Sequence, residues 1–192
     1  MNWMMFNFQN SNSFLMLMMI FLHDFIMMIL LMIMFLILYI MVWFMKNKFL
    51  NLTITHNQFL EFIWTLMPMM VLMFMALPSL YILYKTDEVF NSLLTIMIIG
   101  HQWYWSYEYK DFNDLDFDSF MINELDNGYF RLLEVDNHLI LPKNLMIRCL
   151  LTSVDVIHSW TIPSVGVKMD AVPGRMNQFL ICMDRVGLFY GH

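Results

Sequence analysis

The sequence predicts an α+β membrane protein, in which an N-terminal two-helix transmembrane hairpin in residues 1–90 is followed by a β domain in residues 91–192. Two observations carry this prediction. The first part of the chain contains two charge-free apolar stretches, each long enough to cross a bilayer. The second part contains short runs rich in Val, Ile, Leu and Phe between turn signals such as DNG and PGR, which are typical of an all-β sandwich or barrel.

Composition agrees with a membrane protein that has an acidic polar domain. Of the 192 residues, 60% are hydrophobic and 14% are charged, whereas soluble domains carry about 25% charged residues. From Asp87 onward there are fourteen acidic and seven basic residues. This balance excludes a basic nucleic-acid-binding face and favours a basic protein partner.

The first predicted span covers residues 25–45, between Asp24 and Lys46. As a helix it would be about 31 Å long, enough for the hydrocarbon core. No Lys or Arg precedes it and no small-residue cleavage site follows it, so we interpret it as a retained helix and not a cleaved signal peptide.

The second predicted span covers residues 62–84, between Glu61 and Lys85. It contains Pro68 and Pro78, which a transmembrane helix tolerates. A buried helix of a soluble protein is the alternative, and the length of both stretches argues against it.

The distribution of lysines predicts the orientation. The first 24 residues contain no Lys or Arg, and the loop between the spans carries Lys46 and Lys48. The positive-inside rule places this loop on the cytoplasmic or matrix side. Both termini and the β domain would then lie on the opposite side.

Six apolar runs predict strands in the β domain: SLLTIMIIG, FRLLEV, HLILP, LMIRCLLTS, VIHSWTIP and QFLICM. Cys149 and Cys182 lie in two of these runs without CxxC spacing, so a zinc site is not indicated. Buried free thiols are the default expectation, and a disulfide between the two remains an alternative.

The run GHQWYWSYEY, residues 100–109, alternates as a strand does, which would put Trp103, Trp105, Tyr107 and Tyr109 on one face. One interpretation is an aromatic belt at the membrane surface. The other is a platform for partner docking or short-range electron transfer. The acidic residues that follow are either a solvated loop or a patch that steers a basic protein; they are Glu108, Asp111, Asp114, Asp116 and Asp118.

Two further residues have a structural and a functional interpretation each. His158, in SVDVIHSW, ends an alternating segment and is either a structural histidine or a metal ligand. Glu61, at the start of the second span, is either a boundary residue or the mouth of a proton path, because ionisable groups beside membrane helices often mark such paths.

In their order along the chain, these motifs resemble the subunit II family of mitochondrial cytochrome c oxidase. The resemblance covers essentially the whole chain. It is carried by QFLEFIWTLMP and PSLYILYKTDE in the membrane part and by GHQWYWSYEY, FRLLEVDN, DVIHSW, PGRMNQ and GLFYGH in the β domain. GHQWYWSYEY and DVIHSW are the most specific of these.

The resemblance implies a helical hairpin packed on the catalytic subunit I, other oxidase subunits as further partners, and a cupredoxin-like β-sandwich domain in the intermembrane space of the mitochondrial inner membrane. It implies electron transfer from cytochrome c through a binuclear copper centre to the catalytic subunit, which reduces dioxygen to water and pumps protons. It also allows a magnesium ion at the interface with the catalytic subunit.

The same resemblance assigns roles to individual residues. Trp103 would accept the electron, Trp105 would lie nearer the copper, and His158 would be a copper ligand. Glu61 would lie at the entrance of a proton path. The residues expected to dock cytochrome c are Asp111, Asp114, Asp116, Asp118, Asp136 and Asp155.

One departure from the family pattern concerns the copper ligands. In the family, the tyrosine–glycine pair that matches Tyr190 and Gly191 is soon followed by a Cys-x-x-x-Cys loop, a His and a Met, which supply most of the ligands. This sequence reaches His192 without them. The resemblance therefore predicts an incomplete cupredoxin-like domain without its ligand loop and last strand, and a chain that is inactive alone.

Three explanations stay open at this stage. The sequence is part of a longer chain, or the subunit is split and a second polypeptide supplies the ligand loop, or the subunit lacks copper as quinol oxidases do. The third fits the aromatic run and DVIHSW poorly. The corresponding alternative function is a membrane-anchored docking or assembly module with no copper site of its own.

Overall fold

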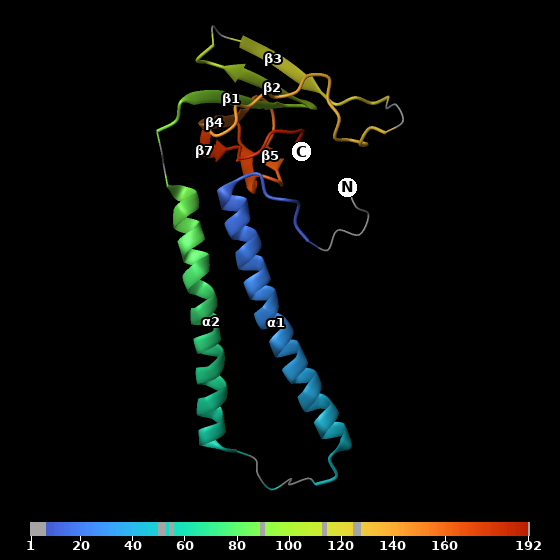
Figure 1. Ribbon diagram of the computed structural model, residues 1–192, viewed down its shortest axis with the longest axis vertical. Coiled ribbons are helices and arrows are strands. Elements are labelled where there is room, and N and C mark those ends of the chain that lie inside the picture. The colour runs from blue at the N-terminus through green and yellow to red at the C-terminus, as the bar shows by residue number, and fades with distance from the viewer. Residues whose placement is uncertain are drawn as a thin grey trace. The chain divides into compact units, whose positions relative to one another are not determined.

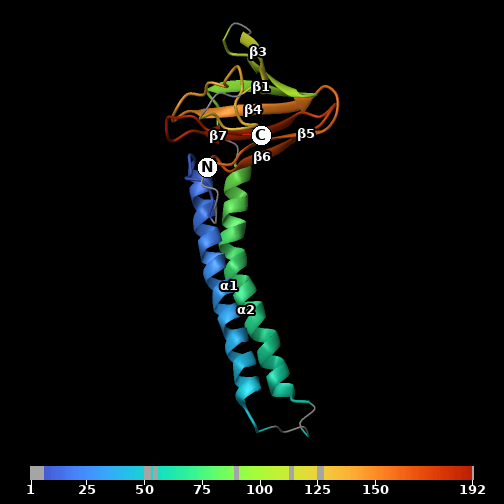
Figure 2. The same ribbon diagram turned by 90° about the vertical axis from the view of Figure 1, so that its right-hand side faces the viewer.

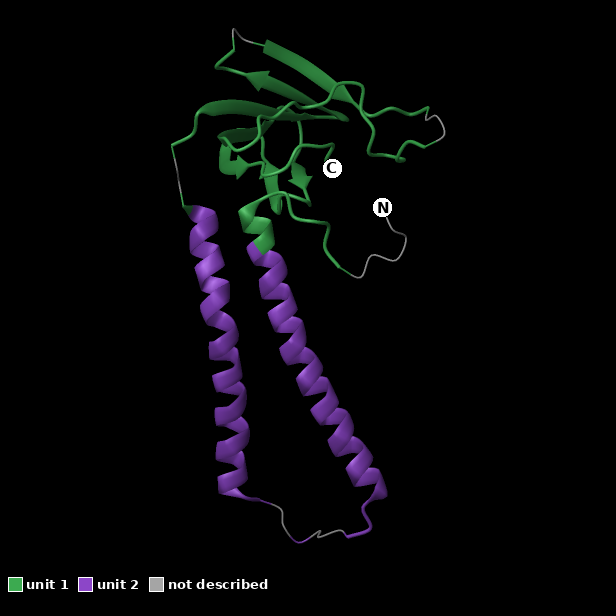
Figure 3. Cartoon of the chain, viewed as in Figure 1, with its two compact units in different colours: residues 1–17, 88–192 green, residues 18–87 purple. Residues whose placement is uncertain are grey.

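The computed structural model describes residues 7–49, 53, 56–88, 91–112, 115–124 and 128–191. The chain forms two compact units (Figure 3): residues 18–87 are one, and residues 1–17 with residues 88–192 are the other. The predicted fold class is confirmed, since two long apolar helices precede a β-sandwich domain.

Both predicted spans lie within longer helices, α1 (Phe14–Lys46) and α2 (Gln58–Asp87). By length and hydropathy, each could cross a membrane. Polar side chains cap their first turns, as the free backbone N–H groups there require. The Ser13 hydroxyl accepts a hydrogen bond from the Met16 N–H at 3.0 Å, and Asn57 Oδ1 accepts one from the Phe59 N–H at 3.1 Å.

The β domain contains seven strands in two sheets (Figures 1 and 2). The larger sheet has the order β3-β2-β1-β4-β7, and the smaller sheet pairs β5 with β6. All pairs are antiparallel except β1 with β4, which are parallel. The strands are β1 (Leu94–His101), β2 (Tyr104–Tyr109), β3 (Leu115–Phe120), β4 (Met146–Ser153), β5 (His158–Ile162), β6 (Val167–Ala171) and β7 (Asn177–Cys182).

The inner faces of the two sheets share one hydrophobic core. Side chains alternate between buried and partly exposed along the whole of β1 and β4, as a strand with one inward face requires. Ile98 of β1, Leu151 of β4 and Trp160 of β5 are among the buried members of this core. Four of the predicted runs, SLLTIMIIG, LMIRCLLTS, VIHSWTIP and QFLICM, correspond to β1, β4, β5 and β7.

Two predicted strands are wrong. FRLLEV forms a turn, in which Leu132 has a φ of 65° and the Leu133 N–H donates to the Phe130 carbonyl. HLILP pairs with a side chain and not with a strand: the Ile140 N–H donates to the Tyr109 hydroxyl at 3.0 Å, and that hydroxyl donates to the Ile140 carbonyl at 2.7 Å.

The segment before α1 belongs to the β domain. Asn12 is fully buried; its Oδ1 accepts a hydrogen bond from the Arg185 N–H at 2.7 Å, and its own N–H donates to the Ser164 carbonyl at 2.7 Å. The Ser13 hydroxyl donates to the Val165 carbonyl at 2.7 Å. Residues 12 and 13 therefore anchor the start of α1 to this domain.

Candidate functional site

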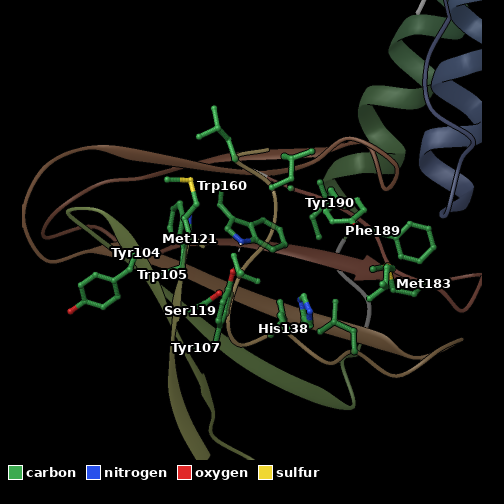
Figure 4. Close-up of a pocket in the computed structure, with 18 of the residues that line it drawn as sticks. Tyr104, Trp105, Tyr107, Ser119, Met121, His138, Trp160, Met183, Phe189 and Tyr190 are labelled. Atoms are coloured by element: carbon green, nitrogen blue, oxygen red, sulfur yellow. Dashed lines mark hydrogen bonds between the residues drawn. The ribbon is translucent and has the colours of Figure 1, made fainter. Parts of the chain in front are cut away.

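A cleft of about 590 Å³ opens in the β domain and is lined by several of its aromatic side chains (Figure 4). Strands β2 and β5 and the segment 183–191 line it. Among the predicted site residues, three line it together: Trp103, Trp105 and His158.

Trp103 lies in the turn that joins β1 to β2, hereafter the Trp103 turn, formed by Gln102 and Trp103. Its side chain is 87% exposed. The predicted sharing of one strand face holds for Trp105, Tyr107 and Tyr109, which all belong to or pack against the core. It is wrong for Trp103, because the chain reverses there and the residue lies outside the strand.

Trp105 and His158 lie edge to face, with ring centroids 6.0 Å apart. Gly100 makes this contact feasible. A Cβ atom at position 100 would lie 3.0 Å from His158 Cδ2 and 3.1 Å from Trp105 Cζ3. Gly100 was not among the predicted site residues, although a glycine inside an apolar strand signals a close approach.

His158 begins β5, and its side chain is 18% exposed. Its Nε2 lies 2.7 Å from Asp155 Oδ1. This hydrogen bond, with those from the Val156 and Gln102 N–H groups, holds the pKa of Asp155 well below its usual range. An ionised carboxylate only accepts hydrogen bonds, so Nε2 carries a proton here.

The wall of the cleft below these residues is a buried aromatic pair. The Trp160 indole N–H donates to the Tyr107 hydroxyl at 3.3 Å, and Figure 4 shows both side chains among those that line the cleft. Burial raises the pKa of Tyr107 to about 12, against the smaller opposing effect of this hydrogen bond. The Tyr107 hydroxyl therefore stays protonated over the whole physiological pH range.

Tyr104 takes a different position from its neighbours in β2. Its ring is stacked on His101, with centroids 4.5 Å apart, and on Phe120, also at 4.5 Å. In Figure 4 it is directed away from Trp160. The aromatic run therefore supplies both the inner wall of the cleft and a stacked outer surface beside the Trp103 turn.

The predicted docking acids differ in how strongly the fold engages them. Asp116 and Asp118 lie on β3, which shows that the acidic run contains a strand where a loop was the simpler interpretation. Asp118 accepts a hydrogen bond from the Ser106 hydroxyl at 2.6 Å. Asp111 accepts one from the Thr95 N–H at 2.6 Å, and Asp136 accepts one from the Phe120 N–H at 2.7 Å. Asp114 lies outside the described residues.

Glu61 belongs to the other unit. It lies in the first turn of α2 with an exposed side chain. Its N–H donates to the Asn57 carbonyl at 3.0 Å, and the Thr65 hydroxyl donates to the Glu61 carbonyl at 3.0 Å. These are backbone contacts, so the carboxylate has no part in them.

The described residues do not fit a binuclear copper centre. No cluster of three or more His, Cys, Asp or Glu side chains occurs among them, and such a centre needs soft thiolate ligands. Cys149 is fully buried in β4, opposite Ile96 of β1. It is four strand positions, or about 13 Å, from the Ser153–Gly100 end where His158 lies.

The second cysteine is no better placed. Cys182 pairs with Met146 in the β4–β7 ladder, three positions from Cys149, and both thiols are free. Burial raises the pKa of Cys149 to about 12, so its thiol is protonated at physiological pH and a poor metal ligand. The expected free thiols are confirmed for both cysteines and the alternative disulfide is wrong, whereas the expected burial holds for Cys149 and Cys182 is only partly buried.

Comparison with known proteins decides the family. The family models for the periplasmic domain and the transmembrane domain of cytochrome c oxidase subunit II match residues 94–192 and 1–82, respectively. The chain belongs to the cytochrome c oxidase subunit II family. It is thus a relative of the subunits of an oxidoreductase complex, and the respiratory-chain context follows from the family.

Insect members of the subunit II family are similar over the whole chain. Cytochrome c oxidase subunit 2 of Lasius sp. is 55% identical over 100% of this chain and 85% of its own length. That of Drosophila subobscura is 52% identical over 98% and 83%, respectively. A solved periplasmic domain of subunit II of the cytochrome oxidase of Bradyrhizobium japonicum is 43% identical, covering 53% of this chain and 72% of its own, with a TM-score of 0.49.

Proposed function

We propose that this member of the subunit II family takes electrons from cytochrome c and passes them toward the catalytic subunit of a proton-pumping oxidase that reduces dioxygen to water. The observation that supports it best is the route along the cleft. Trp103 is exposed at the turn, and the next strand brings Trp105 to within 6.0 Å of His158, centroid to centroid. Conjugated rings in sequence from the surface inward suit short-range electron transfer.

The acidic surface supplies the second part of the proposal. Asp116 is exposed on the edge strand β3, and within the described part of the chain its carboxylate has no hydrogen bond or ion pair. An acid left free in this way acts through its electric field and speeds the association of a basic partner. Cytochrome c is the basic donor that the family resemblance implies.

The membrane orientation is also part of the proposal. Lys46 lies in the last turn of α1 and Lys48 follows it, so the positive-inside rule puts the helix connection in the mitochondrial matrix. The β domain then lies in the intermembrane space. Glu61, in the first turn of α2, would be on the matrix side and serve as the entrance of a proton path in the assembled complex.

For the copper centre, we assign only one ligand to residues 1–192. His158 would contribute an imidazole, and the thiolates would come from outside residues 1–192, either from a further segment of the same chain or from a second polypeptide. The magnesium ion at the interface with the catalytic subunit likewise stays a prediction. The described side chains contain no cluster suited to it.

Affinity isolation of the intact complex through this chain tests the proposal. We expect a haem-containing catalytic subunit to copurify and the preparation to consume oxygen with reduced cytochrome c as donor. A preparation that oxidises only quinol, or that contains no haem protein, would contradict the proposal and favour a docking or assembly module.

Copper analysis tests the ligand assignment separately. Residues 1–192 alone should bind copper weakly, and adding a polypeptide that carries the Cys-x-x-x-Cys loop should restore tight binding. Strong binuclear copper absorption from residues 1–192 alone would refute the assignment of the thiolates to another segment.

A further inference from the structure

Asp155 uses both of its carboxylate oxygens to join two parts of the cleft. Oδ2 accepts a hydrogen bond from the Gln102 N–H of the Trp103 turn at 2.7 Å. Oδ1 accepts hydrogen bonds from the Val156 N–H at 2.6 Å and from His158 Nε2 at 2.7 Å. The Asp155 side chain thus contacts both the Trp103 turn and the imidazole ring of His158.

We propose that Asp155 is a positioning residue, which fixes the Trp103 turn and the His158 ring relative to each other, and not primarily an acid that docks a partner. The neighbouring backbone supports this. Parallel pairing of β1 with β4 puts Gly100 opposite Ser153, and the Val154 N–H donates to the Gly100 carbonyl at 3.2 Å. The sheet thereby brings the Trp103 turn and the segment 154–157 together. The Ser153 hydroxyl contacts the Gly100 carbonyl, and Asp155 joins the segment to the Gln102 N–H of the turn.

Both carboxylate oxygens of Asp155 are engaged by these contacts. Hydrogen bonds to an ionised carboxylate are shorter and stronger than neutral ones, and all three above are at or below 2.7 Å. Asp116 offers the contrast, because it lies on the same domain, is exposed as Asp155 is, and has no such partners among the described residues.

The contact also sets which nitrogen of His158 carries the proton. Because Nε2 donates to Asp155, the neutral ring keeps its lone pair on Nδ1. Fixing one tautomer through an outer hydrogen bond is a general way to orient an imidazole. Gln102 and His158 donate to different oxygens of Asp155. An amide at position 155 has a donor NH2 group in place of one of these oxygens, so one of the two hydrogen bonds is lost.

Asp155→Asn in the full chain, solubilised in detergent micelles, tests the structural part. Nitrogen-15 NMR of the wild type should show His158 as the Nε2–H tautomer and a protected Gln102 amide. In the variant, either the ring changes to the Nδ1–H tautomer or the Gln102 amide exchanges at least about tenfold faster, because one charge-assisted hydrogen bond is lost. Asp116→Asn is the control and should change neither signal. An Asp155→Asn spectrum that keeps both signals would overturn the proposal.

The functional part rests on the proposed function and uses the assembled oxidase. In rapid mixing with reduced cytochrome c, Asp155→Asn should slow electron uptake severalfold at saturating donor and leave the association rate within about twofold of wild type. Asp116→Asn should do the reverse, with weaker salt dependence. A loss confined to association in Asp155→Asn would make Asp155 a docking acid and refute the proposal.

The two experiments fail in distinguishable ways. If the wild-type complex takes no electrons from cytochrome c, the proposed function is wrong, and the NMR result still decides the role of Asp155. If the wild type is active and the NMR signals of Asp155→Asn are unchanged, the positioning role alone is wrong.

Discussion

The imidazole of His158 lies against the indole of Trp105 at an interplanar angle of 66°, with 6.0 Å between the ring centroids. The two residues are on different sheets, β5 and β2, so their contact depends on how closely the sheets approach at this edge. Gly100 lies between them, and its missing side chain leaves the space that both rings use.

Gly100→Ala should therefore disturb the cleft without adding a polar group. Its Cβ would lie 3.0 Å from His158 Cδ2, and such overpacking typically costs about 1–3 kcal/mol. We expect a lower free energy of unfolding, measured by denaturant titration of the full chain in micelles, and a shifted His158 resonance. Unchanged stability together with an unchanged resonance would show that the two rings have room to spare.

The acids of the β2–β3 region should separate into steering and structural residues. Asp116→Asn should slow association with cytochrome c and weaken its salt dependence, with stability unchanged within about 0.5 kcal/mol. Asp111→Ala should instead lower stability by about 0.5–1.5 kcal/mol, because the Thr95 N–H loses its acceptor. Stopped-flow kinetics at several salt concentrations and denaturant titration measure the two effects. Equal association rates for Asp116→Asn and wild type at low salt would remove Asp116 from the steering surface.

The N-terminal anchor predicts a stability effect that acts through Arg185, one of the residues that line the cleft. Asn12→Ala removes the buried acceptor of the Arg185 N–H and should cost about 1–3 kcal/mol in the unfolding of the β domain. Asn10→Ala is the matched control. Only its backbone carbonyl is used, as an acceptor from Arg185 Nη2, so its effect should stay within about 0.5 kcal/mol. Similar losses in both variants would mean that the segment, and not the Asn12 amide, provides the anchor.

Glu61→Gln tests the proposed proton path. The substitution preserves size and removes a charge at the first turn of α2, so proton uptake and turnover in the assembled oxidase should slow while cytochrome c binding stays unchanged. Asp24→Asn, which neutralises the exposed carboxylate of α1, is the control. Turnover equal to wild type at every pH would leave Glu61 as a boundary residue of the helix.

Much of this architecture could be predicted from local sequence patterns. The two apolar stretches bounded by charges predict α1 and α2, and the runs that match the period of a strand predict β1 and β4. Their helical ends were less predictable. α1 begins at Phe14, before the charged residue Asp24, because the Ser13 cap and not a charge determines where the helix starts.

The missed and wrong strands share a cause outside their own residues. β6 carries Lys168 and Asp170, so its run lacks the apolar signal, and it is a strand because it pairs with β5. HLILP has the apolar signal and is not a strand, because the Tyr109 hydroxyl satisfies its backbone. Both outcomes depend on partners outside the segment itself, 31 positions away in the case of Ile140 and Tyr109, which local periodicity cannot report.

In the candidate site too, some features follow from local sequence motifs and others depend on long-range contacts. The aromatic run and His158 are visible as motifs, and the resemblance assigned them roles. That Asp155 would contact both Gln102 and His158 was not predictable from spacing, because the contact to Gln102 spans 53 residues and requires parallel pairing of β1 with β4. The contacts of residues in loops that long-range pairing brings together are the ones that local sequence patterns do not predict.

The most direct test concerns Trp103, exposed at the head of the aromatic run. In the complete oxidase, Trp103→Phe should leave cytochrome c affinity and its salt dependence nearly unchanged, since a flat aromatic surface remains. It should slow electron uptake by at least about tenfold in rapid mixing, because a smaller, displaced ring weakens electronic coupling at the shortest gap. Phe112→Leu, at another exposed aromatic position, is the control and should behave as wild type. If Trp103→Phe takes up electrons at the wild-type rate, or slows only through salt-dependent association as Asp116→Asn does, then Trp103 belongs to a docking surface and the proposed electron route is wrong.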